Sequence, residues 1–106
     1  MKIDIPTIIQ QIYNSEIPVR LEFMYDMGYC WNLIDEKKFP RIFYDFKLEG
    51  VAIENSLSVD KVPIFEKDWL ARGISGSLEM AIKDLSEAIV KYLPESSFSK
   101  WWRNIN

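Results

Sequence analysis

The sequence predicts an α+β domain in which an antiparallel sheet of three to four strands packs against a long helix, with short helices at both ends of the chain. Apolar and polar residues alternate over 19–25 and 29–34, which is typical of strands. Apolar residues over 78–93 recur instead with helical spacing. A sheet with one apolar face needs a covering layer, which the helix supplies. The length of 106 residues fits one domain, expected over 1–106.

The first helix is expected to begin after Asp4. Apolar residues at positions 5, 8, 9, 12 and 13 lie on one helical stripe. Asp4 is a suitable N-cap, and Pro6 is tolerated in a first turn because its missing N–H would have no helical partner there. Pro18 prevents continuation, so the helix is expected to end near Asn14.

The two alternating segments predict a β-hairpin. A two-residue turn at Met27 and Gly28 would set apolar residues opposite polar ones. A three-residue loop over 26–28 keeps the apolar residues on one face and gives Gly28 the positive φ of a G1-bulge hairpin. The polar face then carries Cys30 and Asn32. The expected cross-strand pairs are Tyr25 with Tyr29, Phe23 with Trp31, and Leu21 with Leu33.

The segment from Asp35 to Asp68 has the weakest periodicity. Alternation from Ile42 to Leu48 predicts a third strand ending at Gly50. The residues over 40–50 also fit a short helix with proline at its start and glycine just past its end, so strand and helix both stay open there. Trp69 to Ile74 is predicted to form another strand.

Two helices are predicted after the last strand. Leu78 to Leu93 carries one apolar stripe with Ser77 as its N-cap, and Pro94 prevents continuation. The aromatic residues after Ser96 also recur with helical spacing, which predicts a short final helix. The long helix should cover the sheet and bury Phe23, Trp31, Leu85 and Ile89.

The residue types available favour binding over catalysis. The chain has no histidine, and Cys30 is its single cysteine. This removes the commonest general base, the Ser–His and Cys–His nucleophile pairs, and most zinc sites. We therefore expect no enzyme activity, no structural metal and no cofactor. Carboxylates that pair in space are invisible in a sequence, so a small carboxylate-dependent enzyme or enzyme accessory subunit is the first alternative.

Charge bears on the kind of partner and on location. The formal net charge is −3 and the isoelectric point is about 4.9, which argues against a surface that follows phosphates. A nucleic-acid-binding module that stacks bases on Trp101 and Trp102 beside Lys100 and Arg103 is the second alternative. No apolar run approaches the roughly 20 residues of a membrane span, and the N-terminus does not resemble a signal peptide, so a cytoplasmic location is expected.

One motif resembles a known family. The segment from Ala71 to Ile82 reads ARGISGSLEMAI, and the helix continues to Leu93. It resembles the end of the HicB-type antitoxin core, where a strand and a small-residue turn lead into a Ser/Thr-Leu-Glu-x-Ala helix, and the turn from Asp26 to Tyr29 lies where that family has one. The family's Pro-Asp-x-Pro-Gly stretch is absent, so no functional residue is transferred. The resemblance implies a small sheet-plus-helix fold of a type that neutralises a toxin by binding it.

The resulting hypothesis is a non-catalytic inhibitor of the immunity or antitoxin kind, which binds a protein partner such as a basic toxin domain. Acidic groups would steer a basic partner and reject others, while aromatic anchors would hold the complex. Nucleic acid and membrane are not expected as partners. The predicted contacts lie on the polar hairpin face and in the acidic stretch that follows it: Glu22, Asp26, Asn32, Asp45, Glu49, Glu54, Asp60, Glu66 and Asp68.

Overall fold

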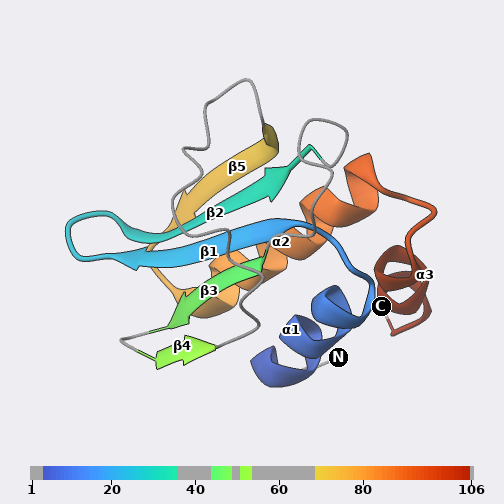
Figure 1. Cartoon of the computed structure of the whole chain (residues 1–106), viewed down its shortest axis with the longest axis horizontal. Helices are drawn as coiled ribbons and strands as arrows, with labels where there is room; N and C mark the ends of the chain where they lie inside the picture. Colours follow the sequence, from blue (N-terminus) through green and yellow to red (C-terminus); the bar gives the residue numbers. More distant parts are fainter. Residues whose placement is uncertain (1–3, 36–43, 49–50, 54–68, 106) are drawn as a thin grey trace.

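The computed structural model of the chain describes residues 4–35, 44–48, 51–53 and 69–105 (Figure 1). It confirms the predicted α+β class, because the sheet packs on a 15-residue helix between shorter N- and C-terminal helices. In chain order the elements are α1 (Ile5–Asn14), β1 (Val19–Met24), β2 (Gly28–Ile34), β3 (Tyr44–Leu48), β4 (Val51–Ile53), β5 (Trp69–Ser75), α2 (Leu78–Tyr92) and α3 (Ser97–Ile105).

The described strands form one sheet in the order β4-β3-β1-β2-β5. The β1–β2 hairpin is antiparallel, as predicted. The pairs β2–β5 and β3–β4 are also antiparallel, and β4 is a strand that was not predicted. The prediction of an entirely antiparallel sheet was wrong at one pair, because β3 runs parallel to β1. Val19 is the register partner of both Leu33 and Tyr44. The chain therefore leaves β2 and enters β3 at the same end of the sheet, which gives β3 the direction of β1. Of the two interpretations left open for 40–50, the strand is correct over the described residues 44–48.

The hairpin loop has the predicted length but lies one residue earlier in the chain. It spans 25–27 instead of 26–28, so Phe23 faces Tyr29 and not Trp31. The predicted pairs were therefore wrong by two residues. A shift of two leaves every side chain on its predicted face, since side-chain direction repeats with that period.

Glycine at position 28 is explained by the turn. The Met27 N–H donates to the Met24 carbonyl at 3.0 Å, and Gly28 follows with a φ of 94°, the positive value that was predicted. A Cβ atom there would also lie 2.5 Å from the carbonyl oxygen of Ser75, so the start of β2 is pressed against the end of β5.

The core lies between the sheet and the helices. Buried side chains from α1, β1, β2, α2 and α3 form one cluster, which contains Trp31, Leu85 and Ile89 as predicted. The prediction for Phe23 was wrong, because this side chain is 38% exposed. The long helix α2 packs mainly on β2 and β5, whereas Phe23 lies next to the last residue of β1, beside the exposed hairpin loop.

The helix starts follow the predicted caps. The Asp4 carboxylate accepts the Thr7 N–H at 2.8 Å, and the Ser77 hydroxyl accepts the Met80 N–H at 3.2 Å. Each cap supplies an acceptor to an N–H that has no partner within the helix. Among the described helices, none has both the length and the apolar character needed to cross a bilayer.

Candidate functional site

The β1–β2 hairpin projects beyond the ends of its neighbouring strands (Figure 1). We call Phe23, Met24, Tyr25, Asp26 and Met27 the hairpin tip. Between Phe23 and Ile34 the sequence has a single charged residue, Asp26, and it lies in this turn. The end of the hairpin is therefore apolar with one carboxylate.

The hairpin tip leaves large apolar side chains in solvent. Tyr25 is 93% exposed, Met27 51% and Met24 42%. Phe23 holds the aromatic part in place, because its ring lies 5.0 Å from that of Tyr29 and 6.3 Å from that of Tyr25. Clustered exposed apolar side chains on a small protein mark interaction surfaces, and aromatic and methionine side chains are enriched in protein interfaces.

A hollow of about 240 Å³ lies on the face of the sheet that points away from α2, and it begins at the hairpin tip. Met24 and Met27 belong to the hairpin tip and also line this hollow. The hollow is lined by Arg20, Glu22, Met24, Met27, Cys30, Trp31, Asn32, Trp69, Arg72, Gly73 and Ile74.

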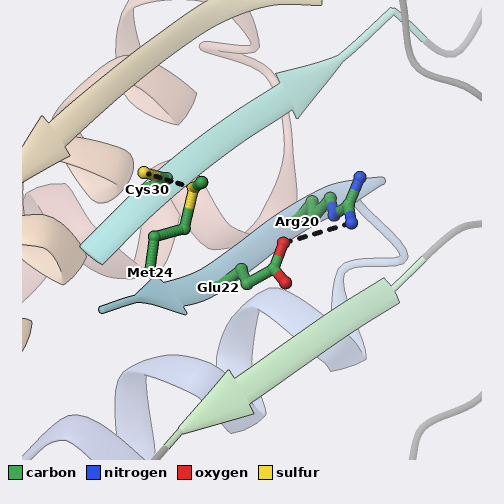
Figure 2. Close-up of polar contacts among 4 residues, drawn as sticks. All are labelled: Arg20, Glu22, Met24 and Cys30. Atoms are coloured by element: carbon green, nitrogen blue, oxygen red, sulfur yellow. Dashed lines mark hydrogen bonds and ion pairs between the residues drawn. The ribbon is translucent and has the colours of Figure 1, made fainter. Parts of the chain in front are cut away.

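Two contacts organise β1 and β2 at this hollow (Figure 2). The Arg20 guanidinium donates to the Glu22 carboxylate at 3.2 Å, which forms an ion pair along β1. The Cys30 Sγ lies 3.4 Å from the Met24 Sδ, so the two sulfur atoms join β2 to β1. Glu22 therefore enters the site as a neutralised carboxylate.

The β5 side of the hollow is cationic. Arg72 is exposed, and its guanidinium carbon lies 4.8 Å from the centroid of the Trp69 ring. Among the residues that the structure describes, no carboxylate forms an ion pair with Arg72. Stacking on an aromatic face leaves the N–H edge of a guanidinium available for a carboxylate.

Only part of the predicted contact set can be placed. Glu22 and Asn32 line the hollow, and Asp26 lies at the hairpin tip. Asp45 is in β3 as the register partner of Arg20. The other predicted contacts lie outside the described residues: Glu49, Glu54, Asp60, Glu66 and Asp68.

Sequence reasoning missed three side chains of this surface, namely Tyr25, Met27 and Arg72. The alternation of β1 predicts that Tyr25 lies on the covered face, whereas its side chain is exposed. The available signal was the scarcity of charge around the turn, since a solvated hairpin loop is normally more polar.

Within 4–35, 44–48, 51–53 and 69–105, no three His, Cys, Asp or Glu side chains gather closely enough to hold a metal ion. Phe98 of α3 is buried, and Trp101 and Trp102 are partly buried against the core, which gives these rings a packing role.

Comparisons with protein-family models, curated proteins and solved structures gave no match. The HicB-type resemblance therefore stays a prediction from sequence.

Proposed function

We propose that this chain is a non-catalytic inhibitor that binds and inactivates a protein partner, most simply a toxin domain in the cytoplasm. The observation that carries the proposal is the hairpin tip. Its tyrosine and methionines are exposed, and they belong to a hairpin that has a hydrogen-bonded turn and projects beyond its neighbouring strands (Figure 1). Exposing this much apolar surface contributes nothing to folding, so a role in binding explains why it is there.

The hairpin tip has the properties of a binding anchor. Tyrosine offers a large contact area with few rotatable bonds, and methionine adapts its shape to the opposing surface. The ring contacts of Phe23 order the tip before binding, which lowers the entropy lost in the complex. Inhibition by such an anchor requires affinity and specificity, and it requires no catalytic group.

Charge supports a basic partner. The chain carries a net charge of −3, and Asp26 is the charged residue of the hairpin turn. A carboxylate beside apolar anchors favours cationic groups at the rim of the partner's binding site and accelerates their encounter. The predicted acidic contacts after β2 would add to the same effect.

The direct test is co-expression with the product of the adjacent gene. We expect that product to arrest growth alone, to be neutralised by this chain, and to be recovered with it in a pull-down. The matched variant is Tyr25→Ser/Met27→Ser, which should lose rescue. Tyr92→Ser, which changes an exposed tyrosine on α2, should keep it. A neighbour that is not toxic, or whose toxicity is the same with and without this chain, would disprove the proposal.

A further inference from the structure

The hollow beside the hairpin tip has a polar end and an apolar end, set by the sheet register. Arg20, Asn32 and Arg72 are register partners across β1, β2 and β5. The next outward-facing row is formed by Glu22, Cys30 and Ile74. Rows two residues apart along a strand are about 7 Å apart. The first row therefore carries two arginines, and the second row carries the Glu22 carboxylate paired with Arg20 at the β1 side and the apolar Ile74 at the β5 side. Along β5 the lining changes from cationic Arg72 to apolar Ile74 over two residues.

Arg72 determines the charge of the polar end. The Arg20 guanidinium forms an ion pair with the Glu22 carboxylate at 3.2 Å. Arg72 instead stacks on Trp69 and has no ion-pair partner among the described residues. A guanidinium held against a ring is preorganised to donate two parallel hydrogen bonds to a carboxylate.

The other end of the hollow is suited to an apolar side chain. Ile74, Met24 and Met27 are between 42% and 51% exposed and line it together. Its volume of about 240 Å³ is below the roughly 300–1,000 Å³ of pockets that enclose drug-sized ligands. The size therefore fits one or two side chains of a larger partner.

We infer that the hollow binds an extended segment of the partner protein in which a carboxylate side chain lies two residues from a large apolar side chain. Side chains at i and i+2 of an extended segment point the same way at about 7 Å, which matches the distance between Arg72 and Ile74 along β5. The inference rests on the proposed function for its biological setting. It adds that this part of the partner is acidic, although the partner as a whole is expected to be basic.

The test uses the full chain and a defined peptide, acetyl-Glu-Ser-Leu-amide, with acetyl-Gln-Ser-Leu-amide as its uncharged match. In ¹⁵N-resolved NMR titrations we expect saturable shifts at the Trp69 indole N–H and at the amides of Asn32 and Ile74. The expected Kd is about 1–10 mM, because a ligand of three residues makes few contacts and loses entropy on binding. The uncharged peptide should bind at least about five-fold more weakly, because it lacks the charge-assisted hydrogen bonds.

Variants separate the two ends of the hollow. Arg72→Gln should weaken the acidic peptide at least about five-fold and remove its advantage over the uncharged peptide. Ile74→Ala should weaken both peptides alike, and Arg103→Gln in α3 should change neither. The inference is overturned if no shift saturates, if the two peptides bind equally, or if Arg72→Gln binds like Arg103→Gln. These outcomes are independent of growth rescue, so the hollow and the inhibitor function can fail separately.

Discussion

The hairpin tip and the C-terminal helix α3 are both aromatic clusters, yet the fold treats them in opposite ways. In α3 the Phe98 side chain is completely buried, and its ring lies 5.9 Å from that of Trp102 in a stacked arrangement. At the hairpin tip Tyr25 is 93% exposed. Aromatic content alone therefore does not distinguish core from interface.

The difference comes from how each cluster is covered and held. Serine side chains bind α3 to neighbouring segments through hydrogen bonds. The Ser99 hydroxyl donates to the Leu93 carbonyl at 2.6 Å, and the Ser97 hydroxyl donates to the Ser15 hydroxyl at 2.8 Å. Within the described residues, the hairpin tip is ordered by its own turn, by ring contacts and by the contact between the Met24 and Cys30 sulfur atoms. We conclude that α3 stabilises the fold, whereas the hairpin tip is presented by it.

The largest expected effect is on the buried side of this comparison. Phe98→Ala should lower the free energy of unfolding by about 3–5 kcal/mol, because it leaves a cavity among packed side chains. Phe23→Ala should cost at most about half as much, since Phe23 is 38% exposed. Urea unfolding followed by tryptophan fluorescence measures both. Equal losses would remove the distinction between the two clusters.

The next effect concerns β5, the edge strand that pairs with β2. A Cβ atom at Gly73 would lie 2.6 Å from the Trp31 ring, which is 6% exposed and has little room to move. Gly73→Ala should therefore cost about 1–3 kcal/mol through overpacking. Gly76→Ala is the matched control, because a Cβ atom there meets nothing within 4 Å. If the two variants were equally stable, Trp31 would not be packed as described.

A smaller, pH-dependent effect is expected at the start of α1. Hydrogen bonds from the side chain and backbone of Thr7 hold the pKa of Asp4 below its usual value. The resulting stabilisation is present above the pKa of the unfolded chain and is lost as pH falls through the lower pKa of the folded state. Asp4→Asn keeps a capping oxygen but cannot titrate, so it should remove this part of the acid dependence. An NMR titration that finds no lowering of the Asp4 pKa would contradict the account.

The smallest stability effect is expected at the hairpin tip. Tyr25→Ser/Met27→Ser should change the free energy of unfolding by no more than about 0.5 kcal/mol, because both side chains are mainly in solvent. Chemical denaturation of the double variant beside the natural chain is the measurement. If the free energy of unfolding fell by about 2 kcal/mol or more, as it does when a buried side chain is truncated, these residues would belong to the core.

The sequence was sufficient for the three helices, for β1, β2 and β5, and for the faces of the hairpin. It left strand and helix open for β3 and did not predict β4. Helix caps at Asp4 and Ser77 and the positive φ of Gly28 follow from local chemistry, which a sequence displays directly. The exposure of Phe23 and the stacking of Arg72 on Trp69 depend instead on where α2 lies and on a register shift between β2 and β5 at Leu33 and Ile34. Periodicity cannot report such tertiary placement, so the hairpin tip appeared only in the structure.

The central claim is that the hairpin tip binds the partner without stabilising the fold. Its most direct test is the affinity of Tyr25→Ser/Met27→Ser for the cognate toxin, measured by calorimetry beside Tyr92→Ser. We expect the double variant to bind at least about 30-fold more weakly, as loss of a binding hot spot of 2 kcal/mol or more requires, and Tyr92→Ser to bind like the natural chain. A double variant that folds normally and binds with undiminished affinity would contradict the claim.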